Sequence, residues 1–183
     1  MLADLLLTRR KSADLLTSML RSIVPGVLEV QAVRDATNQS SPAYRVAIEF
    51  ENAGVVDAEN VSEGTLIALA ILLCVVDNKP DLLLVDDIDK GLHPAAQAEL
   101  VEILRRVLMS TPGMQIVATT HSPYLLDCFD PSEVRVMSLG EDGYARCKKL
   151  TEHPNFAEWE GALKAGELWA SVGEDWIREP AAL

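Results

Sequence analysis

The chain has 183 residues, 49% of them hydrophobic, and a formal net charge of −12 at pH 7. This length and composition predict a single domain over residues 1-183, with enough apolar side chains for a buried core. The acidic charge argues against a large phosphate-binding surface on this chain, because nucleic-acid binders carry a basic patch or stripe. Any contact with nucleic acid would therefore be indirect, through a partner.

Cysteine usage and the apolar segments exclude further classes. Cys74, Cys128 and Cys147 show no C-x-x-C spacing, which argues against a zinc site or a disulfide framework. The start, Met1 to Leu7, is too short and too acidic for a signal peptide. The longest apolar run, Leu66 to Val76, is too short to span a bilayer. We expect a cytoplasmic protein with no membrane association.

The N-terminal part predicts a helix followed by two strands. Apolar residues recur at helical spacing from Ser12 to Ile23, and Pro25-Gly26 ends that helix. Val27 to Val33 is rich in valine, and Tyr44 to Phe50 alternates apolar with polar residues, so both are predicted strands of one antiparallel layer. Two polar segments are predicted loops: Arg34 to Pro42 and Gly54 to Asn60.

The segment after these strands begins a helix with several polar residues. Ser62 is placed to cap it, with Thr65 inside the first turn, and Glu63 puts a negative charge where the helix dipole favours one. A capped helix start with Gly64 in its first turn gives an anion close access to backbone N–H groups. The same residues also fit an ordinary N-cap. The apolar run that follows predicts a helix buried nearly all round.

Two carboxylates follow the next apolar segment. Leu82 to Val85 predicts a strand buried on both faces, and Asp86 and Asp87 stand at its carboxyl end. Ligands bind at that end of strands in open α/β sheets. Adjacent carboxylates repel each other, so they need a cation or a water to act on, and Mg²⁺ with bound phosphates meets that need. The alternative interpretation is an acidic turn after a core strand.

The second half of the chain predicts a helix, a strand and a hairpin. Pro94 is tolerated at the first position of a helix, and Pro112-Gly113 ends that helix. Gln115 to Thr120 is the next predicted strand, and after His121 the chain turns at Ser122-Pro123 into a short helix. Val134 to Leu139 and Tyr144 to Lys149 flank Glu141-Asp142-Gly143, a turn segment that predicts a hairpin.

The tail, residues 152-183, contains all three tryptophans, and we expect it to be helical. Phe156, Trp159 and Leu163 fit one helix face. An aromatic stripe of this kind indicates core or a partner contact rather than a cofactor site.

A series of motifs in chain order resembles those of the ABC-type ATPases, in the branch of SMC, RecF-like and OLD-like proteins that includes AAA-type predicted ATP-binding proteins. Val61 to Thr65 resembles the ABC signature. Leu82 to Asp87 resembles Walker B, and Lys90 to His93 resembles the D-loop. His121 resembles the switch histidine, and the resemblance as a whole runs from Pro25 to Asp127. The Gly-Glu-Leu-Trp and Gly-Glu-Asp-Trp segments of the tail are similar to endings of RecF-like predicted ATPases, which assigns them no role.

One part of the family's pattern is absent from these residues. The sequence contains no G-x-x-x-x-G-K-[ST], the phosphate-cradling Walker A loop. The chain therefore resembles the C-terminal half of an ABC-type ATPase. The fold that this resemblance implies is α/β: part of a P-loop NTPase three-layer core with a mainly parallel sheet, plus a small antiparallel β layer.

The resemblance implies ATP and Mg²⁺ as ligands, and a Walker A-containing ATPase half or a homologous subunit as partner in an oligomer. Asp86 would hold Mg²⁺. Asp87 stands where most of the family has a glutamate that orients the attacking water, and His121 would polarise the region of the γ-phosphate. Aspartate is shorter than glutamate, and placement errors near 1 Å cost about a hundredfold in rate. We expect no turnover by the chain alone.

The remaining residues of the motifs have implied roles at the nucleotide. In ABC proteins the signature meets the γ-phosphate of ATP held by the opposite subunit, a role that would fall here to Ser62, Glu63, Gly64 and Thr65. His93 stands where the D-loop usually ends on an aspartate.

Three functional hypotheses follow. The first is an ATPase half-module that acts with a Walker A chain in DNA repair, chromosome maintenance or phage defence. The second is a non-catalytic regulatory or dimerisation subunit that keeps the ABC fold without turnover. The third takes Asp86, Asp87 and Asp89 as a metal nuclease cluster, but their D-x-D spacing is too common to support it.

Overall fold

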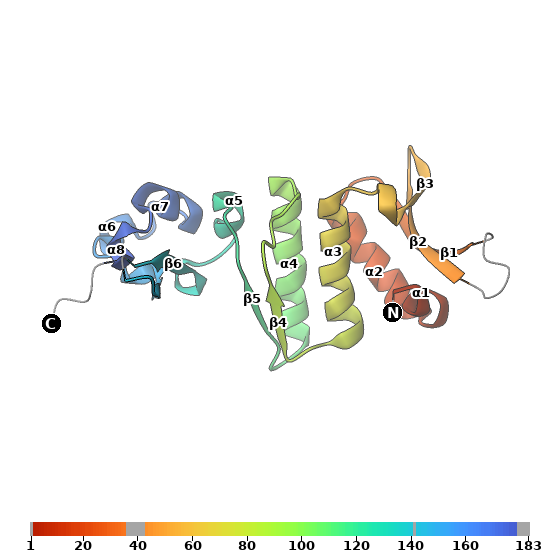
Figure 1. Ribbon diagram of the computed structural model, residues 1–183, viewed down its shortest axis with the longest axis horizontal. Helices are drawn as coiled ribbons and strands as arrows, with labels where there is room; N and C mark the ends of the chain where they lie inside the picture. The colour runs from red at the N-terminus through yellow and green to blue at the C-terminus, as the bar shows by residue number, and fades with distance from the viewer. Residues whose placement is uncertain (1, 36–42, 141, 179–183) are drawn as a thin grey trace. The chain divides into compact units, whose positions relative to one another are not determined.

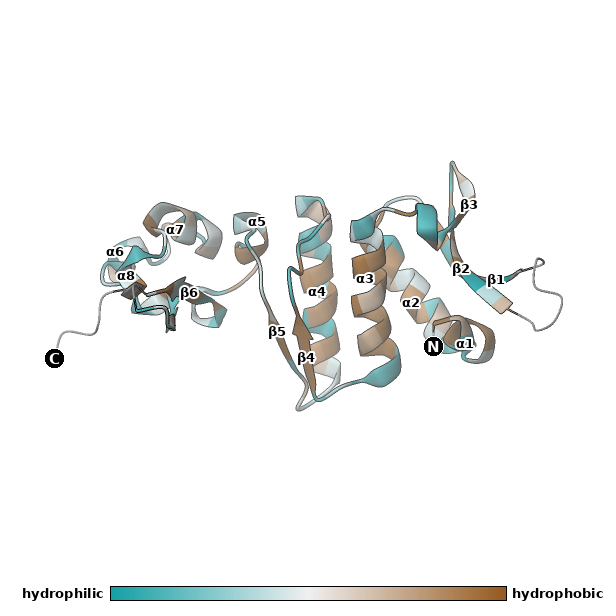
Figure 2. Cartoon of the chain, in the orientation of Figure 1, coloured by the Kyte–Doolittle hydropathy of each residue, from teal (hydrophilic) through white to brown (hydrophobic). Residues whose placement is uncertain are grey.

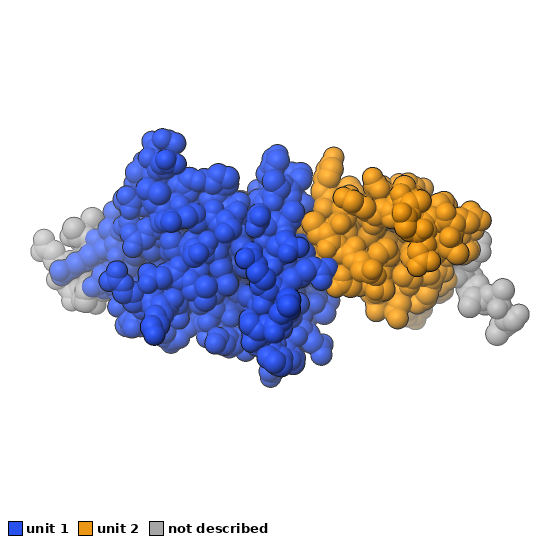
Figure 3. Space-filling model, turned by 180° about the vertical axis from the view of Figure 1, so that it is seen from behind, with its two compact units in different colours: residues 1–119 blue, residues 120–183 orange. Residues whose placement is uncertain are grey.

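The computed structural model describes residues 2–35, 43–140 and 142–178 (Figure 1). The chain divides into two compact units, Met1–Thr119 and Thr120–Leu183, which Figure 3 shows in different colours. Among the helices of the described ranges, none is long and apolar enough to cross a membrane.

The first unit begins with two helices and an antiparallel sheet. Helices α1 (Leu2–Thr8) and α2 (Arg10–Ile23) precede strands β1 (Val27–Asp35), β2 (Ala43–Phe50) and β3 (Gly54–Asp57), which pair in the order β1-β2-β3. Their positions are visible in Figure 1. The predicted α2 helix and the predicted β1–β2 pairing are confirmed, with Val30 opposite Ile48 in the register.

Three details of this region differ from the sequence predictions. The segment from Gly54 to Asn60 is not a loop, because Val55 and Val56 form β3 against β2 and residues Ala58–Asn60 form a 3₁₀ turn. β2 also lacks strict alternation of burial, since Ala47 and Ile48 are both fully buried at the centre of the sheet. The loop predicted from Arg34 to Pro42 overlaps the end of β1, which runs to Asp35. Residues 36–42 of that loop lie outside the described ranges.

The rest of the first unit carries the motifs. Helix α3 (Glu63–Leu73) continues into a π-helical turn (Cys74–Asn78) and is followed by β4 (Leu82–Val85), α4 (Pro94–Ser110) and β5 (Gln115–Ala118). Figure 2 shows the hydrophobic colouring of α3 along most of its length. β4 and β5 pair in parallel, with Leu84 beside Val117 and Val85 beside Ala118. This pairing agrees with the mainly parallel sheet that the family resemblance implies.

One face of the β4–β5 sheet is largely uncovered. Leu82, Leu84 and Val117 are 50%, 68% and 56% exposed, whereas the alternate residues Leu83 and Val85 are half-buried. The prediction of a strand buried on both faces is wrong, because the parallel sheet formed by the described residues has only two strands and its second face carries no covering layer.

The second unit holds a hairpin and short helices around its own core. It contains α5 (Pro123–Leu126), the hairpin β6 (Arg135–Leu139) and β7 (Ala145–Lys149), and then α6 (Phe156–Trp159), α7 (Ala165–Val172) and α8 (Asp175–Arg178). The hairpin prediction is confirmed by the antiparallel pairing of Met137 with Cys147.

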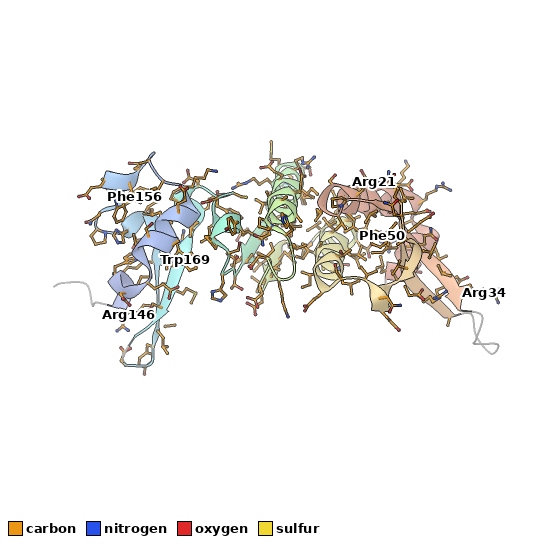
Figure 4. All side chains as sticks on the ribbon, turned by 90° about the horizontal axis from the view of Figure 1, so that it is seen from above. Arg21, Arg34, Phe50, Arg146, Phe156 and Trp169 are labelled. Carbon is orange, nitrogen blue, oxygen red and sulfur yellow. The ribbon has the colours of Figure 1, made fainter. Side chains whose placement is uncertain are left out.

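The aromatic residues of the tail pack on this second core, as expected. Seven partly buried side chains lie against a cluster that includes Leu126, Leu150 and Leu168: Phe129, Phe156, Trp159, Leu163, Trp169, Val172 and Trp176. Phe156 and Trp169 are labelled in Figure 4. The single helix expected through Phe156, Trp159 and Leu163 is wrong, because α6 ends at Trp159 and Gly161 adopts a positive φ of 76°.

Candidate nucleotide site

The signature-like turn is a capped helix start, as the sequence predicts. The Ser62 hydroxyl accepts a hydrogen bond from the Thr65 N–H at 3.3 Å and lies 2.8 Å from the Thr65 hydroxyl. Ser62 and Glu63 are exposed, and Thr65 is buried. The two linked hydroxyls thus stand at the N-terminus of α3, where a helix favours negative charge.

A glycine is required at position 64 because the backbone of Gly91 lies very close to it. Gly64 is buried against the D-loop-like segment, and a Cβ at this position would overlap the carbonyl group of Gly91. Gly91 itself has a positive φ of 69°. The backbone of Gly64 faces these neighbours, so the sequence hypothesis that it contacts a nucleotide remains a prediction beside this packing role.

An ion pair joins the same two segments. The Lys90 ammonium lies 3.0 Å from the Glu63 carboxylate, and this hydrogen bond and charge raise the pKa of Lys90. Because both side chains are exposed, solvent and salt screen the pair. The signature-like turn and the D-loop-like segment are therefore joined chiefly by the backbone contact of the two glycines.

The carboxyl ends of β4 and β5 form a small hydrogen-bonded group around Thr119. The Thr119 hydroxyl donates to the Asp86 carboxylate at 2.5 Å and accepts from the Asp87 N–H at 2.9 Å. The Thr119 carbonyl accepts from the Ile88 N–H at 3.1 Å. Thr119 was not among the predicted site residues, although a position after the end of a predicted strand is where ligand-binding residues gather in α/β sheets.

Asp87 has an unusual backbone conformation. Its φ is +49°, which is uncommon outside glycine and is tolerated best by Asn and Asp. The turn therefore suits an aspartate at this position better than a longer or branched side chain. Both Asp86 and Asp87 are exposed at the end of the sheet.

His93 is used as a helix cap. Its Nδ1 accepts a hydrogen bond from the Ala95 N–H at 3.3 Å, directly before Pro94 begins α4. The Gln97 amide donates to the Leu92 carbonyl at 3.0 Å, which fixes the end of the same segment. The chain thus employs His93 locally, and its proposed contact with a nucleotide stays a prediction.

His121 belongs to the second unit and is exposed there. It lies between two residues with hydroxyl groups that order the turn: the Thr120 hydroxyl accepts from the Ser122 N–H at 3.0 Å, and the Ser122 hydroxyl accepts from the Leu125 N–H at 3.3 Å. The backbone around His121 is therefore defined by the start of α5.

The polar side chains at this edge of the sheet fit a Mg²⁺ ion held by one or two carboxylates better than a metal site built from three or more protein side chains. Mg²⁺ is usually held by one or two carboxylates, waters and substrate phosphates, and the exposed Asp86 carboxylate, oriented by Thr119, would supply one such ligand. In the part of the chain that the structure describes, no three His, Cys, Asp or Glu side chains gather as a metal site. This finding does not favour a nuclease cluster at Asp86, Asp87 and Asp89.

Comparison with known proteins identifies the family. The family described as "AAA domain, putative AbiEii toxin, Type IV TA system" matches residues 2–127, which is more than half of the chain. The chain belongs to this family. Together with the relatives and solved structures below, this membership confirms the predicted resemblance to ABC-type ATPases of the SMC-like group.

Curated relatives share part of the sequence. The Septu protein PtuA of Bacillus thuringiensis is 32% identical over 75 residues, which cover 41% of this chain and 18% of the relative. PtuA of Bacillus mycoides is 34% identical over 93 residues, covering 46% and 13%. A "Putative ABC transporter ATP-binding protein" of Streptomyces avermitilis is 32% identical over 135 residues, covering 70% and 23%. The chain thus spans less than a quarter of the length of each of these relatives.

Solved structures of SMC heads share the fold. A chain from a study of ATP-driven dimerization and DNA-stimulated activation of SMC ATPases aligns with a TM-score of 0.58 and 14% identity over 94% of both chains. The Smc head domain of Pyrococcus yayanosii, solved with a coiled coil and joint, aligns with a TM-score of 0.60 and 14% identity over 91% of this chain and 29% of that one. The predicted α/β fold class, with a parallel pair and separate antiparallel strands, is confirmed.

Proposed function

We propose that this chain is an ATP-binding and ATP-hydrolysing half-module that works with a Walker A-bearing partner. The observation that carries the proposal is the group formed by Asp86, Asp87 and Thr119 at the carboxyl ends of two parallel strands. That edge is where α/β sheets of this kind bind ligands. Membership of the AAA-domain family supports the choice of a nucleotide as that ligand.

Each acidic residue has a separate proposed role. Asp86 would hold Mg²⁺, which supplies positive charge to the phosphates when it is bound. Asp87 orients the attacking water, and Thr119 positions Asp86 through its 2.5 Å hydrogen bond. Signature residues Ser62 and Thr65 contact the γ-phosphate of ATP held by an opposite subunit, and His121 polarises the same group.

The proposed partner supplies what these residues lack. Without Walker A, the phosphates lose most of the backbone N–H donors and the lysine that cradle them. The exposed apolar face of β4–β5, with Leu82, Leu84 and Val117, supports a requirement for further polypeptide against the sheet. The similar SMC ATPases undergo ATP-driven dimerization, which is consistent with an assembly of this kind.

We propose phage defence as the setting in which the module acts, ahead of DNA repair and chromosome maintenance. The support is the similarity of the chain to two Septu proteins. The acidic net charge of −12 favours nucleic-acid contact through a partner rather than by this chain.

A second candidate function is a regulatory or dimerisation subunit without turnover. Two observations favour it: Gly64 is buried against Gly91, and the His93 ring caps α4. Both residues thus have a structural role that needs no nucleotide. The two functions differ in whether Asp87 affects the rate of ATP hydrolysis.

The test is calorimetric and kinetic, on the complex of this chain with a co-expressed polypeptide that carries Walker A. We expect Asp86→Asn to weaken binding of Mg·ATP, and Asp87→Ala to leave binding intact while abolishing turnover. Asp81→Asn is the matched control, because Asp81 is an exposed carboxylate directly before β4, at its opposite end. Equal turnover in all four proteins would refute the ATPase function and favour the regulatory subunit.

A further inference from the structure

Helix α5, which begins two residues after His121, is too short to be stable on its own. It spans Pro123–Leu126, a single turn, and isolated turns of helix are unstable because nucleation costs more than one hydrogen bond returns. Ser122 and Leu125 at its start are nevertheless buried. Contacts from elsewhere in the second unit must therefore order this turn.

Helix α7 of the tail supplies these contacts. Gly166, its second residue, lies so close to α5 that a Cβ would overlap the Pro123 carbonyl oxygen and crowd the Asp127 carboxylate. Leu168 on α7 and Leu126 on α5 belong to the same buried cluster. A glycine inside a helix normally costs about 1 kcal/mol relative to alanine, so its presence here is explained by the close approach of the two helices.

Asp127 joins the two helices through hydrogen bonds. It lies directly after α5, and its Oδ1 accepts from the Gly166 N–H at 2.9 Å and from the Glu167 N–H at 3.3 Å. A carboxylate at this place caps the first turn of α7 and is favoured by the helix dipole. The end of α5 and the beginning of α7 are thus held together by one side chain.

We propose that α7, acting through Gly166 and Asp127, is a positioning element for His121. The proposal rests on the proposed role of His121 at the γ-phosphate. The Thr120 and Ser122 hydroxyls tie the backbone on both sides of His121 to the start of α5, so a shift of α5 moves the imidazole with it. This assigns a role to the Gly-Glu-Leu-Trp segment of the tail, which begins at Gly166.

The test uses NMR of the full chain without nucleotide. The imidazole signals of His93, His121 and His153 are assigned with His→Gln variants, and amide exchange is followed at Leu125 and Leu126. We expect Asp127→Ala and Gly166→Ala each to shift or broaden the His121 signals and to speed exchange in α5 by roughly fivefold to tenfold, as for loss of a helix cap. The His93 signals should not move.

Two controls separate positioning from general stability. Asp127→Asn keeps the Oδ1 acceptor and should retain the wild-type His121 signals, and Ser171→Ala changes an exposed residue of α7 without touching α5. If Asp127→Ala fails to fold, Gly166→Ala still decides the matter, since alanine favours the helix itself. A lower melting temperature with unchanged His121 signals in Gly166→Ala overturns the proposal.

The NMR test remains informative even if the proposed function fails, because none of its measurements requires ATP. Shifted His121 signals in Asp127→Ala, together with unaltered ATP turnover in a partnered His121→Ala complex, would support the positioning and reject only the role of His121 at the phosphate.

Discussion

The Thr119 hydroxyl donates a 2.5 Å hydrogen bond to the Asp86 carboxylate and accepts one from the Asp87 N–H at 2.9 Å. One side chain directly after β5 thereby fixes both acidic residues that follow β4. In the proposed Mg²⁺ site, loss of the partner that orients Asp86 would cost about tenfold to a hundredfold in metal affinity.

Removing this hydroxyl tests the arrangement. We expect Thr119→Val to lower the free energy of unfolding by about 1 kcal/mol or less, because water replaces part of the lost hydrogen bonding at this exposed residue. The Mg²⁺ concentration needed for half-maximal turnover of the partnered complex should rise by about tenfold. Thr119→Ser retains the hydroxyl and should behave as wild type in both assays. A Thr119→Val protein with unchanged Mg²⁺ dependence would contradict the positioning of Asp86.

The contact between Gly64 and Gly91 makes a second prediction. Gly64→Ala should destabilise the chain by about 1–3 kcal/mol, because the added methyl group overlaps the Gly91 carbonyl. Helix propensity alone predicts a gain of about 1 kcal/mol. The control is Ala70→Gly at an exposed site of the same helix, which should lose about 1 kcal/mol. Urea denaturation that shows Gly64→Ala to be stabilised would exclude the close approach.

Sequence patterns identified most of the elements that carry the motifs. The apolar run before Asp86 and the strand before His121 were recognisable because both are short, β-branched or leucine-rich, and bounded by Pro, Gly or Asp. The cap at Ser62 and the helix start at Pro94 follow from local chemistry and are confirmed.

Features that depend on distant contacts were not recognisable. Thr119 only follows a strand in the sequence, and the pairing of β4 with β5 is what brings it beside Asp86. Gly64 resembles a ligand-binding glycine in the sequence, and only the approach of Gly91 reveals its packing role. The strand at Val55 and Val56 exists because β2 offers it a partner.

The exposed face of the β4–β5 sheet predicts association. Leu84, at 68% exposure, lies on that face beside Val117. We expect the wild-type chain at low micromolar concentration to sediment as an oligomer and Leu84→Lys to sediment as a monomer, since burying a lysine there is costly. Met109→Lys is the control, because Met109 is 85% exposed on α4, away from the sheet face. A monomeric wild-type chain would contradict this prediction.

Burial of His153 predicts a pH dependence of stability. Its ring packs against Trp159 and Trp176, with centroids 4.9 and 5.1 Å apart, and burial lowers the pKa of His153 from 6.5. The unfolded chain therefore binds the proton more readily, so this contribution to stability is complete above pH 6.5 and is lost as the pH falls toward the lowered pKa. Melting temperatures between pH 5 and 8 should show this slope, and His153→Phe should flatten it. An unchanged slope in His153→Phe would assign the effect to another group.

The rate of phosphate release from Mg·ATP, measured first with the purified 183-residue chain and then after addition of a Walker A-bearing partner, tests the half-module most directly. We predict no turnover by the chain alone, because the phosphate cradle is missing, and turnover that appears with the partner and disappears in Asp87→Ala. Robust hydrolysis by the chain alone that Asp87→Ala abolishes, in a preparation free of other ATPases, would contradict the account.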